Sequence, residues 1–173
     1  MSKDVLITSL RQVGLMQGLS PYQITEIARR ADRIVFKPGD TIIAADAHAD
    51  AAILIVSGTA ERRHGPGLDG SPEPLPAGVI LGEMAMLIDT SHSSTVVAAT
   101  QVRALRIARS DMHDLMAEEP AVAEHFIAKI AGRLTDLAKE MRDIDGILAG
   151  TGPDAYAGLT AVEQATPAQI QIH

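Results

Sequence analysis

The spacing of hydrophobic positions along this chain is first typical of helices and then typical of strands. Over residues 2–31 they recur every three or four positions, as in amphipathic helices, and Ser20 followed by Pro21 is typical of an N-cap and first helical turn. Over residues 33–108 they form short β-branched runs separated by Gly, Pro and Asp, which is typical of antiparallel strands. The pattern predicts an α+β protein in which two short helices precede an antiparallel β-roll or barrel.

Helical spacing returns at about residue 110. Ser110 is a suitable N-cap for one helix, and Pro120 fits the first turn of a second, long helix over about residues 120–146. In that helix the apolar residues are spaced alternately by four and three positions, which is the heptad pattern of a coiled coil. The heptad seam contains Ile127, Ile130, Leu134, Leu137, Met141 and Ile144.

This seam predicts a partner for the long helix. At 1.5 Å per residue the helix reaches roughly 35 to 40 Å, which is longer than a lid over a small barrel requires. We therefore expect it to pack on a second copy of the chain and form a homodimer, in preference to packing only on its own roll. Residues 147–173 are mostly small or polar, and we expect a tail that is flexible or depends on a partner for its order.

Composition narrows the classes of function. The 173 residues carry a formal net charge of −7, which disfavours a general attraction to nucleic acid or anionic membranes. No apolar stretch reaches the ~18 residues of a membrane span, and the start of the chain lacks the basic tip and apolar run of a signal peptide. The chain has no cysteine, so it has no disulfide framework. No Lys or Arg follows Arg142, so no DNA-reading helix is expected. We expect a cytoplasmic protein with one domain, residues 1–146, that contacts neither DNA nor membrane.

Signatures of catalysis and of metal binding are missing from the sequence. It contains no recognisable nucleophile with its base, no paired-carboxylate motif and no phosphate loop. Its histidines lack the H-x-H pair and following acid of a cupin-type metal barrel. We expect no enzymatic activity, no metal and no cofactor.

The segment over residues 81–98, LGEMAMLIDTSHSSTVVA, carries the candidate chemistry. Gly82 permits a close approach of the backbone to a ligand, and Glu83 can accept hydrogen bonds from vicinal hydroxyls. A helical turn from Met84 directs backbone N–H groups at an anion. This combination favours a pocket for a sugar and a phosphate.

The same segment resembles the phosphate-binding cassette of cyclic-nucleotide-binding domains, whose pattern reads roughly F-G-E-[LM]-A-L, then a loop, then R-[AS]-[AST]-[TS]-V. The resemblance covers about residues 10–145 and includes F-K-P-G-D at 36–40 and S-G at 57–58. It is nearest to the sensor domain of the catabolite-activator (Crp/Fnr-like) branch. It implies a jelly-roll-like β-roll of about eight strands and a long C-terminal dimerisation helix. The matching positions are Gly82, Glu83, Met84, Ala85, Leu87, Ser93, Ser94, Thr95 and Val96.

One departure falls on the phosphate site, because the arginine of the family pattern is His92 here. The resemblance implies cAMP or cGMP as the ligand, with Glu83 on the ribose 2′-hydroxyl. It implies that the phosphate oxygens bind the N–H groups of Met84 and Ala85 together with Ser93, and that His92 replaces the arginine in part. Ser94 completes the candidate ligand-binding set.

Simpler interpretations stay open for several of these residues. Glu83 can instead stabilise the helical turn, and Ser94 and Thr95 can be ordinary residues at the entry to a strand. Arg62 and Arg63, on the strand before a polar Gly- and Pro-rich loop, are expected to be solvated unless one reaches the pocket in place of the missing arginine.

Three functions fit the sequence. The first is a stand-alone cyclic-nucleotide sensor that acts through a homodimer and an unknown protein partner. The second is a nucleotide-independent dimerisation or docking module with a degenerate pocket. The third is a pocket for a different ligand, such as a cyclic dinucleotide.

Overall fold

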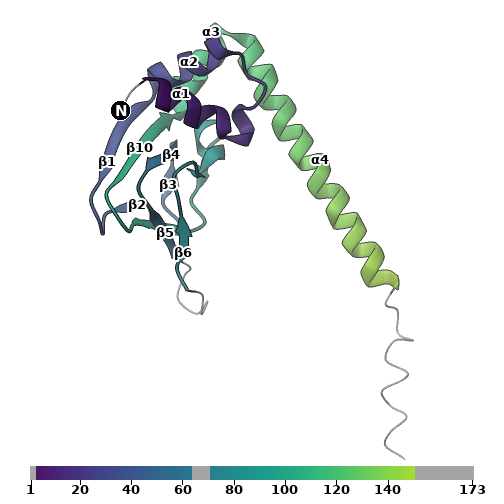
Figure 1. Ribbon diagram of the computed structural model, residues 1–173. Coiled ribbons are helices and arrows are strands. Elements are labelled where there is room, and N and C mark those ends of the chain that lie inside the picture. Colours follow the sequence, from purple (N-terminus) through teal and green to yellow (C-terminus); the bar gives the residue numbers. More distant parts are fainter. Residues whose placement is uncertain (1–2, 64–70, 151–173) are drawn as a thin grey trace, which may run out of the picture. The chain divides into compact units, whose positions relative to one another are not determined.

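The computed structural model describes residues 3–63 and 71–150, shown in Figure 1. The chain divides into two compact units, Met1–Lys129 and Ile130–His173. The first unit contains the β-roll and the helices that pack on it. Of the second unit, the structure describes the continuation of the last helix through Gly150.

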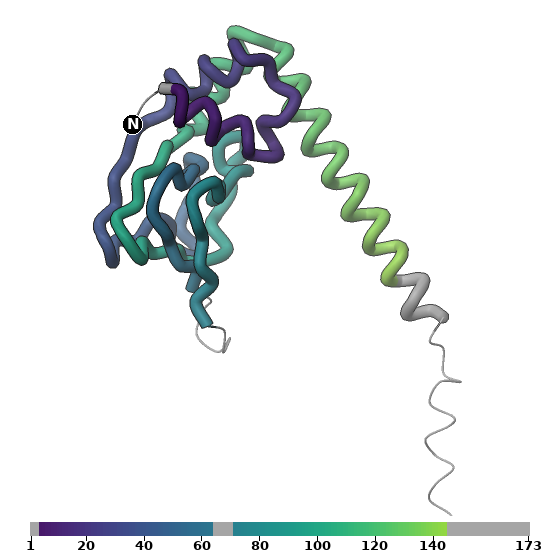
Figure 2. Tube along the Cα trace, viewed as in Figure 1, coloured from purple at the N-terminus to yellow at the C-terminus, as the bar shows by residue number. Residues whose placement is uncertain are grey.

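Two α-helices open the first unit, as the spacing predicts. Helix α1 spans Lys3–Gln12, the 3₁₀ turn η1 spans Gly14–Met16, and α2 spans Pro21–Arg30. The predicted N-cap is confirmed as a capping box, in which the Gln23 N–H donates to Ser20 Oγ at 3.2 Å and the Ser20 N–H donates to Gln23 Oε1 at 2.9 Å. Figures 1 and 2 show α1 and α2 at one end of the roll.

The strands form two four-stranded antiparallel sheets and one short pair, which confirms the predicted β-roll. The sheet orders are β1-β10-β4-β7 and β2-β9-β5-β6, with β3 paired to β8. The described residues contain ten strands instead of about eight, because several two-residue pairings count as strands of their own. The strands are β1 Asp32–Phe36, β2 Thr41–Ile43, β3 His48–Ala49, β4 Ala51–Ser57, β5 Ala60–Arg63, β6 Glu73–Leu75, β7 Ile80–Leu81, β8 Thr90–Ser91, β9 Thr95–Ala98 and β10 Val102–Ala108.

The core of the roll lies between the two sheets. Ile53 and Ile55 from β4 meet Val96 from β9 in one buried apolar cluster, which Ala60 and Leu75 extend on the β5–β6 side. Burial of these side chains, at roughly 25 cal/mol per Å² of apolar surface, stabilises the frame that holds the site. The cluster contains mostly aliphatic side chains, in keeping with an aromatic content of 2%.

The polar loop after Arg63 connects the two strands of a β-hairpin. Strand β5 pairs with β6 in antiparallel register, with Ala60 opposite Leu75 and Arg62 opposite Glu73. The middle of the loop, residues 64–70, lies outside the described residues.

Two helices follow the roll. Helix α3 spans Arg109–Glu118 with Ala108 as its N-cap, so the prediction that Ser110 caps this helix is wrong. The helix begins earlier because β10 runs directly into it, and the Arg109 N–H donates to the Asp50 carbonyl oxygen at 2.8 Å. The last helix, α4, spans Pro120–Gly150; its predicted start is confirmed, and it ends four residues after the expected position 146.

Apolar side chains of α4 separate into a buried start and an exposed continuation. Val122 and Phe126 are buried in the first unit. The predicted seam is largely exposed in the single chain, and Ile130 is half-buried. No helix in the described ranges, α4 included, is long and apolar enough to cross a membrane. The exposed seam residues are Ile127 (67% exposed), Leu134 (62%), Leu137 (54%), Met141 (60%) and Ile144 (55%).

Candidate functional site

The candidate site begins at a residue with a left-handed backbone conformation. Gly82 follows β7 with φ 60° and ψ 40°, a conformation that glycine adopts at little cost, and it is the N-cap of the 3₁₀ turn η2, Glu83–Met86. Within the turn the Ala85 N–H donates to the Gly82 carbonyl oxygen at 2.8 Å. Binding of a phosphate by the Ala85 N–H therefore requires a shared hydrogen bond and stays a prediction.

The second wall of the site is the segment between β8 and β9. Its backbone is fixed at His92, whose carbonyl oxygen accepts from the Asp46 N–H at 2.9 Å and whose N–H donates to the Ala47 carbonyl oxygen at 3.1 Å. The Thr95 hydroxyl accepts from the Ala45 N–H at 3.0 Å, so its side chain has the structural role that the simpler interpretation gave it. These bonds fix the wall beside the cassette.

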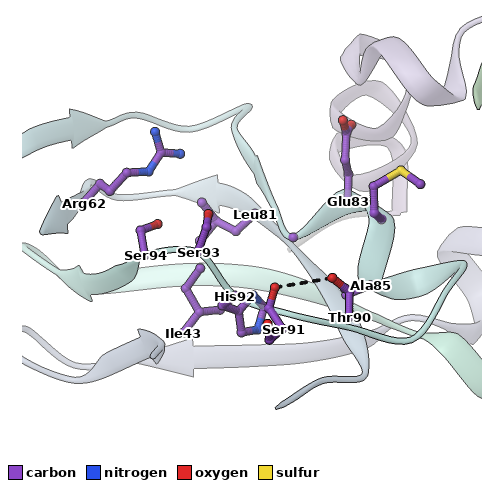
Figure 3. Close-up of a pocket in the computed structure, with 12 residues that line it drawn as sticks. Ile43, Arg62, Leu81, Glu83, Ala85, Thr90, Ser91, His92, Ser93 and Ser94 are labelled. Atoms are coloured by element: carbon purple, nitrogen blue, oxygen red, sulfur yellow. Dashed lines mark hydrogen bonds between the residues drawn. The ribbon is translucent and has the colours of Figure 1, made fainter. Parts of the chain in front are cut away.

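The two walls enclose a cavity of about 530 Å³, shown in Figure 3. All seven candidate ligand-binding residues line it: Gly82, Glu83, Met84, Ala85, His92, Ser93 and Ser94. Ile43, Leu81, Thr90 and Ser91 also line it, and the sequence interpretation did not include them. These four residues reach the cavity because of how the strands pair, and the spacing of a sequence motif does not reveal strand pairing.

His92 lies directly over the cassette glycine. A Cβ added to Gly82 would stand 2.9 Å from His92 Cε1, so the absence of a side chain at Gly82 allows this packing. Burial lowers the pKa of His92 below its ordinary value, and the nearby Asp50 carboxylate opposes this effect. The imidazole is therefore mostly neutral at pH 7, and it lacks the fixed charge of the arginine in the family pattern.

His92 also borders a second cavity. His48, Asp50 and Arg106 line this second cavity, which has a volume of about 300 Å³. Arg106 Nη2 donates to Asp50 Oδ2 at 2.8 Å, so the carboxylate that acts on the imidazole already has a cation as its partner. His92 thus separates the candidate pocket from this charged cluster.

The two arginines of β5 differ in their surroundings. Arg62 lines the candidate pocket, and its Nη1 donates to Glu73 Oε2 at 2.8 Å. Arg63 is exposed. In Figure 3 the Arg62 side chain lies on the side of Ser94, and the Glu83 side chain lies on the opposite side. Arg63 is therefore solvated as expected, whereas Arg62 lies at the pocket, where the alternative interpretation placed one of the two arginines.

Hydrogen bonds connect the segment after η2 to α3. Arg109 Nη1 donates to the Ile88 carbonyl oxygen at 2.9 Å and to Asp89 Oδ1 at 3.3 Å. His113 Nε2 donates to the Leu87 carbonyl oxygen at 2.9 Å. A displacement of the cassette would therefore change the environment of the helix that follows the roll.

No cluster of three or more His, Cys, Asp or Glu side chains in residues 3–63 and 71–150 is arranged to hold a metal ion. The chemistry of the site is that of hydrogen-bond donors and acceptors with one histidine, one arginine and the carboxylate of Glu83. This arrangement suits recognition of a polar, anionic ligand.

Comparison with known proteins identifies the family of this domain. The family model for the cyclic nucleotide-binding domain matches residues 33–119. The cAMP-dependent protein kinase regulatory subunit of Aspergillus niger is 33% identical over 107 residues, which are 62% of this chain and 26% of that protein. The cyclic AMP receptor protein of Thermus thermophilus is 27% identical over 160 residues, which are 91% of this chain and 74% of that protein. The chain spans about a quarter of the length of the kinase regulatory subunits that it matches.

Solved structures show the same roll. A cyclic nucleotide-binding-like protein from Brucella abortus superposes with a TM-score of 0.60 at 31% identity, covering 65% of this chain and 97% of that one. The Thermus thermophilus catabolite activator protein superposes with a TM-score of 0.59 at 26% identity, covering 76% of this chain and 62% of that one. The family match extends over half of the sequence and contains the whole candidate pocket. The chain belongs to the cyclic nucleotide-binding domain family.

Proposed function

We propose that this protein is a non-enzymatic sensor module that binds a cyclic nucleotide, cAMP or cGMP, in the candidate pocket. The observation that carries the proposal is that all seven candidate ligand-binding residues line one cavity in a domain of this family. The names of the Aspergillus and Thermus relatives associate both of those proteins with cAMP.

The pocket offers a different group to each part of the ligand. The Glu83 carboxylate accepts a hydrogen bond from the ribose 2′-hydroxyl, because an ionised carboxylate has only acceptor sites. The N–H of Met84 and the N–H and hydroxyl of Ser93 donate to the phosphate oxygens, with the Ala85 N–H sharing its bond. His92 contributes most when it is protonated.

Ligand binding acts on α3 through the bonds from Arg109 and His113. A ligand shifts a conformational equilibrium only by its difference in affinity for the two states, so the bonds must differ between the empty and the occupied protein. We propose that α3 and α4 transmit this difference to a homodimer and, through it, to a protein partner in the cytoplasm.

The test of ligand binding is calorimetric titration of the purified protein with cAMP and with cGMP. We expect micromolar affinity for at least one nucleotide, and we expect Glu83→Gln to weaken it roughly tenfold to hundredfold, because a hydrogen bond to a charged group contributes about 1.5 to 3 kcal/mol. Glu61→Gln is the matched control, since Glu61 lies on β5 and does not line the pocket. Absence of binding, or equal affinities of the wild type and Glu83→Gln, would contradict the proposal.

The homodimer has a separate test. The exposed seam predicts a dimer of twice 18.3 kDa in sedimentation equilibrium, and Leu134→Glu with Leu137→Glu should yield the monomer, because four carboxylates would meet across the seam. Lys139→Glu is the control, since it makes the same change of two charge units per chain at a heptad position away from the seam. A wild-type monomer would refute the dimer without affecting the ligand proposal.

The replacement of the arginine by His92 favours one second candidate, a dimerisation or docking module that does not depend on a nucleotide. That function predicts an intact dimer together with no heat of binding for either nucleotide. The two tests above therefore separate it from the sensor.

A further inference from the structure

Strand β5 has a charged residue, Arg62, at an inward-facing position, where the alternation of side chains along the strand predicts an apolar one. Successive residues of a strand point to opposite faces, so Arg62 shares a face with Ala60, which is fully buried in the core of the roll. The register with β9 agrees, because Ala60 pairs with Ala98 and Arg62 pairs with Val96, and both partners are buried. Arg62 is therefore an inward-facing residue at the end of the core, and its side chain lines the pocket.

This position matters because the pocket has little other positive charge. Among the described residues that line it, Arg62 is the one Lys or Arg. His92, at the position of the arginine in the family pattern, is mostly neutral at pH 7. For a singly charged phosphate in this cavity, the permanently charged partner would be Arg62 on β5.

Arg62 has a counter-ion that a ligand would have to compete with. Glu73 lies opposite it on β6, and the pair is partly exposed, with 34% of the Arg62 side chain and 50% of the Glu73 side chain accessible. The bond from Nη1 to Glu73 uses one of the five N–H donors of the guanidinium group. A guanidinium can present two parallel N–H groups to a phosphate, which makes it a stronger partner for this anion than an imidazole.

We propose that Arg62 binds the phosphate of the cyclic nucleotide in place of the arginine missing at position 92, and that Glu73 holds and partly neutralises Arg62 in the empty protein. This inference rests on the proposed function and extends it to a residue outside the cassette. It explains how the pocket keeps a cation for its ligand although His92 has replaced the arginine.

The experiment is titration with cAMP and cGMP at pH 8, where His92 is neutral. We expect Arg62→Gln to weaken binding roughly tenfold to hundredfold, as the loss of a charge-assisted contact should. Arg62→Lys should restore part of the affinity, because it keeps the charge and loses the paired donors. Glu73→Gln should tighten binding about two- to fivefold, since it removes the competing carboxylate.

Arg63→Gln is the matched control, because it removes the same charge from the neighbouring, exposed residue on the other face of β5. The nucleotide affinity of Arg63→Gln should stay within about twofold of the wild type, since salt screens an exposed charge outside the pocket. Equal affinities of Arg62→Gln and Arg63→Gln would overturn the inference while leaving the proposed function intact. If the wild type binds neither nucleotide, the proposed function fails and this inference fails with it, because Arg62 then does not replace the arginine missing at position 92.

Discussion

Replacement of His92 by arginine is expected to tighten cyclic-nucleotide binding about tenfold to hundredfold at pH 8. The histidine stands at the phosphate-binding position of the family pattern, and its burial over Gly82 lowers its pKa, so it contributes little charge at this pH. A guanidinium at the same position carries a permanent charge and donates in pairs, which adds about 1.5 to 3 kcal/mol for one charge-assisted contact. Calorimetric titration of His92→Arg beside the wild type measures the difference directly.

The same pair of proteins should differ in their dependence on pH. In the empty wild type the pKa of His92 is lowered, while a bound phosphate favours the imidazolium, so the complex takes up a proton more readily than the free protein. Wild-type affinity should therefore increase as the pH falls towards and below about 6.5, by no more than tenfold per pH unit, and stay constant above pH 7.5. His92→Arg should show a flat profile from pH 6 to 8. A flat wild-type profile would mean that His92 does not contact the phosphate.

The second large effect concerns the fold. Gly58→Ala is expected to destabilise the roll by about 3 to 5 kcal/mol, which combines backbone strain with overpacking. Gly58 has φ of +91°, and a Cβ at this position would lie 2.2 Å from the Gln101 carbonyl oxygen and 3.0 Å from Val102 Cα. Both obstacles are backbone atoms at the start of β10, so the clash requires the central strand pair to move. Urea unfolding followed by circular dichroism measures the loss.

Gly39→Ala separates the two contributions. Gly39 has the same φ of +91°, and apart from Gly39 and its two chain neighbours no residue has a heavy atom within 4 Å of the place where its Cβ would stand. This variant should lose only the cost of the left-handed conformation, about 1 to 2 kcal/mol. Equal losses for Gly39→Ala and Gly58→Ala would show that the approach of Gln101 to Gly58 is not restrictive.

Much of the fold was predictable because its signals are local. The N-cap at Ser20 and the start of α4 at Pro120 depend on residues within one turn of each other, and both are confirmed. The start of α3 was not predictable from the same kind of signal. Ser110 has the residue type of an N-cap, yet the bond from the Arg109 N–H to Asp50, about sixty positions earlier in the chain, places the helix start before it.

The candidate site divides in the same way. The cassette residues stand close together in sequence, so their motif was sufficient to place them in one cavity. Arg62 lies twenty residues before Gly82, beyond a loop, and its inward orientation depends on the register between β5 and β9. Periodicity indicated a strand there, but only the pairing shows which of the two arginines faces the pocket. Ligand binding by the cassette and pairing of the seam remain predictions.

The bonds from Arg109 to Ile88 and Asp89 have a thermodynamic consequence. If they make the position of α3 depend on the occupancy of the pocket, the dependence holds in both directions, because coupling between two binding sites is reciprocal. A partner that binds α3 would then change the affinity of the protein for the nucleotide. The nucleotide would change the affinity of the protein for the partner by the same factor. A tenfold factor corresponds to about 1.4 kcal/mol of coupling free energy. The concentration of the partner would thus set the nucleotide level at which the protein responds.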